Sequence, residues 1–391
     1  MATGKQQREQ LRVLRIAHSS LTPALRERER ALVRNFPNVA MEVITTYNWR
    51  EAEVEVAAEA DDLFPVRPAS THFSKHIQLF AYDPRPIVAA LRGHRPHLID
   101  MNHEPYSVAC AEILTLCGRY APTTPVVMQT AQNILRRYPV PFNWLEQRAL
   151  RRVSAAYVCS ETVREVLRAK GFQKPVPIIP FGVDLNSFKE RTHPRIASRT
   201  IGFVGRMLPG KGLNVLVNAL KQMRNDDWTL LVVGDGSERE SFTRELSEAG
   251  LLNRVRFTGA VSYDLTPHYF QEIDALVIPT QTIGRIREQF GRVIVEAMAS
   301  GVPVIGSTCG AIPEVIADAG LVFPEGDGKA LADALRLLLS DLEMRRRFSQ
   351  LGRARVEENY SWDHVASKTH ALYRQVLSKR ERSAAKLTIA A

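Results

Sequence analysis

Residues 287–307 read REQFGRVIVEAMASGVPVIGS, and this stretch decides how the rest of the chain is interpreted. Apolar residues recur at helical spacing from Phe290 onward, and Gly301 is suited to end a helix. The run VPVI that follows is rich in β-branched residues and typical of a buried strand. The stretch therefore predicts a loop, a helix that begins near Phe290 and ends at Gly301, a tight turn and a strand.

Two glutamates, Glu288 and Glu296, flank the predicted start of this helix. If every step between them were helical, their Cα atoms would lie roughly 12 Å apart, farther than the about 5–9.5 Å of paired glycosidase carboxylates. A loop would shorten that distance. Main-chain N–H groups near Phe290, Gly291 and Arg292 have no partner within the helix and form an anion site. The spacing favours a nucleotide-sugar, with hydroxyls at both ends and phosphates between; the alternative is two surface glutamates on an ordinary helix.

Length and composition predict a globular protein of two or three domains. The chain has 391 residues, of which 45% are hydrophobic and 24% charged. No apolar stretch reaches the length of a transmembrane helix, and the first residues lack a signal-peptide core. The four cysteines, Cys110, Cys117, Cys159 and Cys309, show no metal-ligand or disulfide spacing. These features predict a cytoplasmic location.

The net charge of +10 favours an anionic partner. Residues 134–152 mix arginines with Tyr138, Phe142 and Trp144, a combination that suits an anionic membrane surface. A helix with a solvated basic face is the alternative, and it is slightly favoured. No nucleic-acid motif is present, so no nucleic-acid partner is expected. If the membrane interpretation holds, the protein is peripheral at the inner membrane face.

Short β-branched runs alternate with helical segments, which predicts an α/β fold of doubly wound parallel sheets. An Arg- and Glu-rich solvated helix is expected over 23–36, a strand over 76–80, and a disordered tail after Lys379. The expected domains are an N-terminal acceptor-binding domain, a nucleotide-sugar-binding domain, and a C-terminal helix that crosses back to the first domain. Their expected boundaries are 1–182, 183–360 and 361–391.

Ligands of open parallel sheets bind where the strands end, and polar loops follow three predicted strands: 18–22, 102–106 and 205–212. In the last loop, GRMLPGKG, Arg206 and Lys211 form a candidate diphosphate clamp. The alternative is a strand-to-helix turn with solvated cations, which is about equally supported.

Two histidines, His103 and His18, also follow predicted strands and are able to exchange hydrogen bonds near neutral pH, although a lone histidine is more often structural. The chain contains no Asp-x-Asp and no cluster of residues with metal-ligand spacing. No metal and no cofactor are therefore expected. A phosphate leaving group would then be stabilised by cations and helix amides.

The combination of EQFGRVIVEAMASGVPVI, GRMLPGKG, LLVVGDG, VRFTG and IPFGVD resembles retaining glycosyltransferases of the GT-B fold, similar to glycosyltransferase family 4. The resemblance covers essentially the whole chain. It implies two facing Rossmann-like domains with the active site in the cleft between them.

The resemblance also assigns roles to residues. It implies that Glu288 binds hexose hydroxyls and Glu296 the ribose. Arg206 and Lys211 would hold the diphosphate with amides of Phe290, Gly291 and Arg292, and His103 would lie near the transferred sugar. The candidate donor-side residues are therefore Arg206, Lys211, Glu288, Phe290, Gly291, Arg292 and Glu296.

The chain departs from the family pattern after its first strand. HSSLT stands where many members have a Gly-Gly loop, so His18, Ser19 and Glu104 are only candidates for the acceptor side. The function expected is retaining, metal-independent hexosyl transfer from a nucleotide-sugar to a glycan or polyprenyl-linked acceptor of the cell envelope. The alternatives are a nucleotide-sugar epimerase or phosphorylase on the same fold, or a non-catalytic glycan-binding protein.

Overall fold

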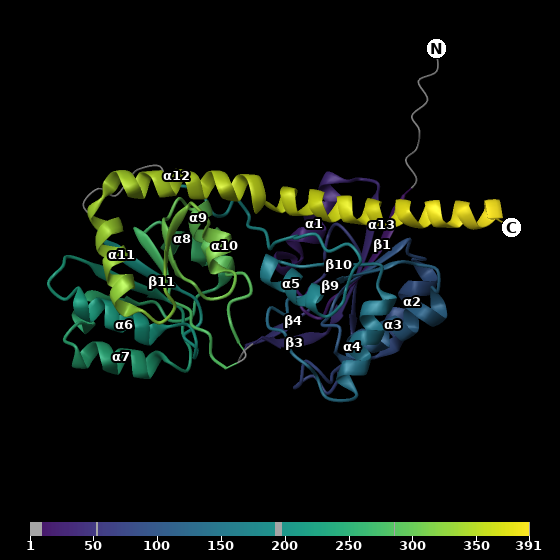
Figure 1. The fold of residues 1–391 in the computed structure, drawn as a ribbon, viewed down its shortest axis with the longest axis horizontal. Coiled ribbons are helices and arrows are strands. Elements are labelled where there is room, and N and C mark those ends of the chain that lie inside the picture. Colours follow the sequence, from purple (N-terminus) through teal and green to yellow (C-terminus); the bar gives the residue numbers. More distant parts are fainter. Residues whose placement is uncertain (1–9, 52–53, 192–197, 285, 391) are drawn as a thin grey trace, which may run out of the picture. The chain divides into compact units, whose positions relative to one another are not determined.

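The computed structural model describes residues 10–51, 54–191, 198–284 and 286–390, and the chain divides into two compact units. Unit 1 comprises Met1–Cys159, Val163–Ile179 and Trp362–Ala391. Unit 2 comprises Ser160–Thr162 and Pro180–Ser361. Each unit has a six-stranded parallel sheet flanked by helices (Figure 1).

In unit 1 the strands lie in the order β10-β9-β8-β1-β2-β5. Numbered along the chain and read from the β5 edge, this is 3-2-1-4-5-6, the order of Rossmann-like sheets. The strands are β1 (Leu11–Ile16), β2 (Val39–Thr46), β5 (Val66–Ala69), β8 (Leu98–Asn102), β9 (Val126–Gln129) and β10 (Ala155–Tyr157). Two small antiparallel pairs accompany the sheet: β3 (Asn48–Glu51) with β4 (Val54–Ala57), and β6 (Thr71–His72) with β7 (Ala81–Tyr82).

The helices of this first part of the fold are η1 (Pro23–Arg26), α1 (Glu27–Asn35), α2 (Pro84–Gly93), α3 (Val108–Tyr120), α4 (Phe142–Arg152), α5 (Glu161–Ala169) and α13 (Trp362–Ala390). Ser107 caps the start of α3, because its side chain accepts a hydrogen bond from the amide of Cys110. The last helix, α13, packs against α1 within unit 1.

Unit 2 repeats the same strand order, β13-β12-β11-β14-β15-β16. Its strands are β11 (Thr200–Val204), β12 (Thr229–Val233), β13 (Val255–Phe257), β14 (Ala275–Ile278), β15 (Val304–Ser307) and β16 (Gly320–Phe323). Its helices are α6 (Leu213–Gln222), α7 (Arg239–Glu248), α8 (Thr266–Phe270), α9 (Arg292–Ala299), α10 (Ile312–Ile316), α11 (Gly328–Ser340) and α12 (Leu342–Asn359), with short turns η2 (Leu252–Arg254) and η3 (Tyr263–Leu265). The doubly wound α/β prediction is confirmed in both units.

Several local predictions were wrong. Residues 76–80 form turns and not a strand. The helix of the opening stretch begins at Arg292, two residues later than predicted, because Gly291 takes a left-handed conformation with φ of 82°. The helix α13 extends to Ala390 where a disordered tail was expected. The helix α12 had not been predicted.

The expected solvated helix over 23–36 is the most informative error. Arg26, Arg28 and Glu29 are all buried there. Arg28 and Glu29 join a charged cluster in the core, and Arg26 pairs with the buried Asp61. A high content of charged residues therefore did not mean exposure to solvent, since each charge has a partner from a distant segment.

The charged cluster in unit 1 has Asp100 of β8 at its centre. Arg15 of β1 lies directly opposite Asp100 in the sheet and donates to it at 2.7 Å. Arg28 donates at 3.1 Å, and the hydroxyls of Tyr157 and Tyr373 also donate to this carboxylate. Burial alone would raise the pKa of Asp100, but the two arginines and the tyrosine hydrogen bonds together outweigh burial and hold it below its usual value.

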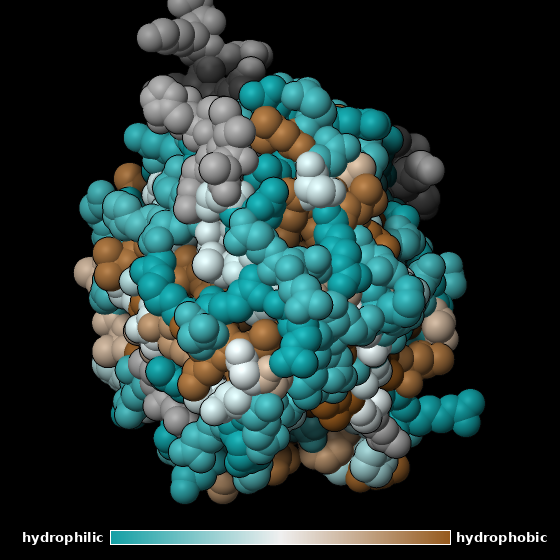
Figure 2. All heavy atoms as spheres, turned by 90° about the vertical axis from the view of Figure 1, so that its left-hand side faces the viewer, coloured by the Kyte–Doolittle hydropathy of each residue, from teal (hydrophilic) through white to brown (hydrophobic). Residues whose placement is uncertain are grey.

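Apolar side chains fill the remaining core of each unit, as in Ile201, Leu216 and Trp228 of unit 2. On the face seen in Figure 2, hydrophilic residues predominate and hydrophobic ones occur in small groups between them. In the described part of the chain, no helix combines the length and the apolar character needed to cross a bilayer.

Candidate active site

The donor-side residues lie where the strand order of unit 2 changes direction. The strands β11 and β14 are neighbours at the centre of the sheet, and Ile201 pairs with Ala275. The loop after β11 carries Arg206 and Lys211, and the loop after β14 leads to Glu288. Such a crevice at the carboxyl ends of two adjacent strands is the usual ligand site of open α/β sheets.

A pocket of about 540 Å³ occupies this position. All seven donor-side residues predicted from the sequence line it, although they come from two separate segments. They are Arg206, Lys211, Glu288, Phe290, Gly291, Arg292 and Glu296. The volume is in the range of pockets that hold ligands of nucleotide size.

The two loops are in direct contact through an ion pair. The Nζ atom of Lys211 lies 2.8 Å from Oε2 of Glu288, and both side chains keep some exposure to the pocket. A ligand that enters here meets a cation and a carboxylate side by side. The ammonium suits a phosphate oxygen, and the carboxylate suits hydroxyl donors.

Glu296 lies one turn inside α9 and is 6% exposed. The hydroxyl of Tyr263 donates to its Oε1 at 3.2 Å, and a guanidinium nitrogen of Arg292 lies 3.8 Å from the same oxygen. Burial raises the pKa of Glu296, while Arg292 and the Tyr263 hydrogen bond oppose the rise. The carboxylate is thus held in place at the wall of the pocket.

Close backbone packing fixes the position of Glu288. A Cβ atom at Gly310 would lie 2.0 Å from the carbonyl oxygen of Glu288, so no larger residue fits there without moving the loop. The amide of Ala311 also donates to this carbonyl at 3.2 Å. The loop after β11 is held similarly, since a Cβ at Gly212 would lie 1.8 Å from the carbonyl oxygen of Pro279.

In unit 1 the predicted histidines lie at the equivalent place. His18 follows β1 and His103 follows β8, and these strands are neighbours at the centre of the sheet. Their ring centroids are 5.4 Å apart, and Trp49, Phe80 and Tyr82 surround them. The Tyr82 hydroxyl lies 3.2 Å from Nε2 of His103.

Both imidazoles are neutral at physiological pH. Burial, together with the charge of Arg15, lowers the pKa of His18 to about 4. Burial also lowers the pKa of His103 well below its usual value. Nδ1 of His18 is buried and makes no hydrogen bond to the described residues. The pair therefore offers neutral donors and acceptors and no cations.

The other two acceptor-side candidates have different surroundings. Ser19 lies within 3.5 Å of the Asn102 amide nitrogen and stays at this edge of the sheet. Glu104 is buried and uses its oxygens on Thr130 and on the amide of Ala131. Its carboxylate fixes the loop after β9, and burial raises its pKa.

The structure thus collects the donor-side residues in one pocket of unit 2, and His18, His103 and Ser19 at one sheet edge of unit 1. Sequence reasoning missed Tyr263, which lines the pocket and touches Glu296. Nothing in its local pattern marks it, since its role depends on a residue 33 positions away. Within the described residues, no group of three His, Cys, Asp or Glu could hold a metal ion.

Two family models match the chain. The model described as "Glycosyl transferases group 1" matches residues 187–355, and "Glycosyltransferase Family 4" matches residues 27–187. Together they span most of both units.

Similar proteins include a phosphatidyl-myo-inositol mannosyltransferase of Mycobacterium leprae, 36% identical over 51% of this chain and 53% of that protein. A 2-deoxystreptamine glucosyltransferase of Streptomyces kanamyceticus is 29% identical over 77% of this chain and 76% of that protein. A GDP-mannose-dependent alpha-(1-6)-phosphatidylinositol monomannoside mannosyltransferase of Mycobacterium tuberculosis is 31% identical over 54% of this chain and 59% of that protein. With the mannosyltransferases, the match therefore spans little more than half of the relative.

Solved structures with the same fold extend over nearly the whole chain. Sucrose-phosphate synthase from Thermosynechococcus elongatus has a TM-score of 0.70 at 20% identity, over 95% of this chain and 100% of that one. An Anabaena protein, HepE, solved in complex with UDP, has a TM-score of 0.72 at 18% identity, over 93% of this chain and 100% of that one.

Proposed function

The chain belongs to the glycosyltransferases of the group 1 and family 4 type and has their GT-B architecture, and from this premise we propose that it transfers a hexose from a nucleoside-diphosphate sugar with retention of the anomeric configuration. One observation carries the proposal: the pocket of unit 2 joins three cations, two carboxylates and the start of a helix. Cations between two carboxylates suit a nucleotide-sugar, in which the diphosphate lies between the ribose hydroxyls and the hexose hydroxyls.

Each group has a chemical task in the proposed donor complex. The carboxylate of Glu296 accepts hydrogen bonds from the ribose hydroxyls, and Glu288 accepts those of the hexose. The diphosphate lies between them, near Arg206, Lys211 and the amides at the start of α9. Binding of the diphosphate to Lys211 replaces part of the Lys211–Glu288 pair and leaves Glu288 to the sugar.

In the proposed reaction the bond between the anomeric carbon and the phosphate oxygen breaks, and the bond to the acceptor oxygen forms on the same face. The acceptor proton passes to a donor phosphate oxygen, so no carboxylate of the protein acts as a nucleophile. Arg206, Lys211 and the helix amides stabilise the charge that grows on the leaving diphosphate. We propose that this suffices without a metal or a cofactor, and full activity in the presence of EDTA is the expected result.

We propose a lipid-linked glycan, polyprenyl- or phosphatidylinositol-linked, as the acceptor. Mannosyltransferases of Mycobacterium with phosphatidylinositol acceptors in their names support this choice. The neutral histidines His18 and His103 would receive the acceptor hydroxyl, and the unpartnered Nδ1 of His18 is available for it. The enzyme would then work at the cytoplasmic face of a membrane with an anionic surface.

A thermal-shift panel of UDP-, GDP- and ADP-sugars tests the donor site. A donor at roughly 100 times its Kd adds about 2.7 kcal/mol to the free energy of unfolding, and one nucleotide series is expected to do so. The variant Lys211→Ala should lose the shift, whereas Lys221→Ala, at the exposed end of α6, should keep it.

Two results would contradict the proposal. One is a panel without any shift. The other is a Lys211→Ala variant with full turnover of the true donor. Epimerised free donor, or sugar 1-phosphate released only with added phosphate, would instead identify an epimerase or a phosphorylase.

A further inference from the structure

A second, strongly basic pocket lies on unit 1, between α3 and α4, which pack side by side (Figure 1). Its volume is about 590 Å³. Four arginines line it: Arg119 from α3, and Arg148, Arg151 and Arg152 from α4. No residue of the donor or acceptor side belongs to it.

These guanidinium groups are not neutralised by the protein. None of the four forms an ion pair with a carboxylate in the part of the chain that the structure describes. Arg148 donates only to the Thr115 hydroxyl, at 3.3 Å, and Arg152 to the carbonyl of Pro122, at 3.4 Å. Four like charges with neutral partners repel one another, and an anion in the pocket would relieve that repulsion.

The acidic residues of the two helices are used elsewhere. The sequence places one on α3, Glu112, and one on α4, Glu146. Glu112 accepts a hydrogen bond from the amide of Tyr82, and Glu146 pairs with Lys170. The charged side chains on the helix faces that meet at the pocket are therefore all basic.

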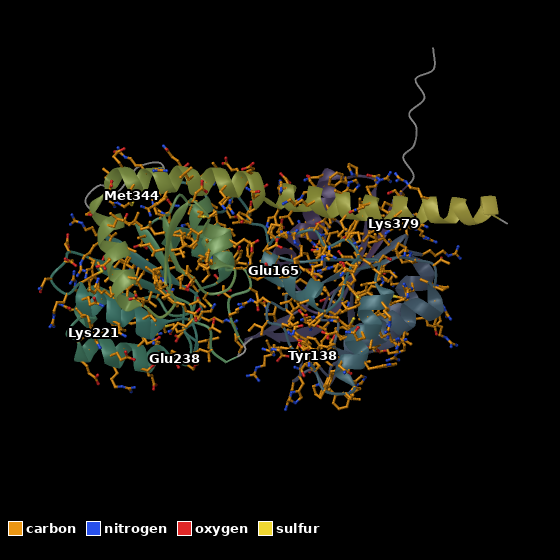
Figure 3. The ribbon with its side chains drawn as sticks, in the orientation of Figure 1. Tyr138, Glu165, Lys221, Glu238, Met344 and Lys379 are labelled. Carbon is orange, nitrogen blue, oxygen red and sulfur yellow. The ribbon has the colours of Figure 1, made fainter. Side chains whose placement is uncertain are left out.

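Exposed apolar side chains lie before α4 and in its first turn. In the loop before α4, Leu135 is 59% exposed and Val140 is 79% exposed, and Trp144 in the first turn of α4 is 56% exposed. The same loop is held to the body of unit 1 by Tyr138, labelled in Figure 3, whose ring stacks on Tyr106 at 4.1 Å. The apolar residues are thus presented outward from a fixed loop.

We propose that the arginine pocket binds the phosphate headgroups of anionic phospholipids while the loop before α4 enters the boundary between headgroups and acyl chains. Arginine binds phosphate through paired N–H donors, and Trp144 is of the residue type enriched at membrane interfaces. Exposed aliphatic side chains such as Leu135 and Val140 favour lipid over nucleic acid, since bases stack on aromatic rings. The inference rests on the proposed lipid-linked acceptor for its purpose, because docking would bring the enzyme to that acceptor.

Vesicle co-sedimentation of the full chain tests the inference. Vesicles of phosphatidylcholine alone are compared with vesicles in which about a third of the lipid is phosphatidylglycerol. The wild type should bind the anionic vesicles only, and binding should fall as salt rises. Replacing two arginines in Arg148→Gln/Arg151→Gln should weaken binding roughly 30-fold.

A matched control separates the pocket from net charge. The variant Lys221→Gln/Arg244→Gln removes two exposed cations from α6 and α7 of unit 2 and should bind as the wild type does. A Trp144→Ala variant keeps every charge and should still lose part of the binding. Equal losses in both double variants would overturn the inference, as would equal binding to neutral vesicles.

Two further measurements complete the test. A single-stranded oligonucleotide at equal phosphate concentration should not displace the protein from vesicles, and displacement would show a nucleic-acid site instead. The nucleotide-sugar thermal shift of Arg148→Gln/Arg151→Gln should equal that of the wild type. If the wild type fails to bind anionic vesicles but shows the nucleotide-sugar thermal shift, this inference alone is refuted. If the wild type shows no thermal shift with any nucleotide-sugar, the proposed function is refuted.

Discussion

The two sheets share one strand order but differ in where their charges lie. In unit 1, Arg15 and Asp100 face each other on the two central strands, inside the core. In unit 2 the corresponding strands, β11 and β14, carry no charged residue. Lys211 and Glu288 lie beyond the strand ends at the wall of a pocket. The position of a charge relative to the sheet therefore separates the residues that stabilise the fold from those that serve chemistry.

The largest effect is expected from Asp100→Ala. The change leaves Arg15 and Arg28 buried without their shared carboxylate, which should cost about 3–5 kcal/mol of unfolding free energy. Urea denaturation measures it. The exposed Asp227→Ala is the control and should change stability by less than about 0.5 kcal/mol. If Asp100→Ala does not fold, Tyr373→Phe, which removes one hydrogen bond to Asp100, should still lower stability by about 1 kcal/mol. If both variants were as stable as the wild type, the charged cluster would not be what stabilises unit 1.

Glu288→Ala should lower activity and leave stability nearly unchanged. Because Glu288 lies at the pocket wall, transfer should fall at least about 100-fold, while the unfolding free energy changes little. Steady-state kinetics with the donor found in the thermal-shift panel measure the loss. Glu248→Ala, on the exposed face of α7, is the matched control. A variant that lost stability and activity together would remove the distinction between the two units.

A fall in pH should destabilise unit 1 through the protonation of His18. Its folded pKa of about 4 lies below the usual 6.5, so the unfolded chain takes up a proton first as the pH falls. The stability contribution is complete above pH 6.5 and is lost between pH 6.5 and 4. Between pH 7 and pH 5 His18 alone should lower the free energy of unfolding by about 2 kcal/mol. The buried His103, whose pKa is also lowered, adds to the fall in the same direction, and His18→Gln should remove the part due to His18. An unchanged pH dependence in that variant would assign the effect to other groups.

The smallest effect is expected from Tyr263→Phe. Loss of its hydrogen bond to Glu296 should weaken nucleotide binding about fivefold, equivalent to about 1 kcal/mol. Isothermal titration calorimetry with the nucleoside diphosphate measures the change. Tyr269→Phe, in the neighbouring α8 and outside the pocket lining, is the control. Equal losses in both variants would argue against a role for the Tyr263 hydroxyl.

The sequence predicted best where local patterns carry the information. Helical spacing and the Gly301 end signal located α9, and β-branched runs located most central strands. All seven donor-side candidates line one pocket, because loops that follow neighbouring parallel strands converge at the same edge.

The remaining features depend on contacts between distant residues. Arg28 looked solvated because its partners, Asp100 and Tyr157, are 72 and 129 positions away. Tyr263 was missed for the same reason. Gly291 is a local exception. Its left-handed backbone delays the start of α9, and a Cβ atom there would lie 2.8 Å from the side chain of Ile294 in the same helix.

The hydrogen bond from Tyr373 to Asp100 has a consequence for biosynthesis. The 273 residues that separate the two take about 15–50 s to synthesise at roughly 5–20 residues per second. The nascent first unit waits through that interval with its central carboxylate lacking one donor and with the surface of α1 uncovered by α13. The second unit is nearly contiguous and has all its elements earlier. In the cell, the unit that is translated first is therefore the last to be completed.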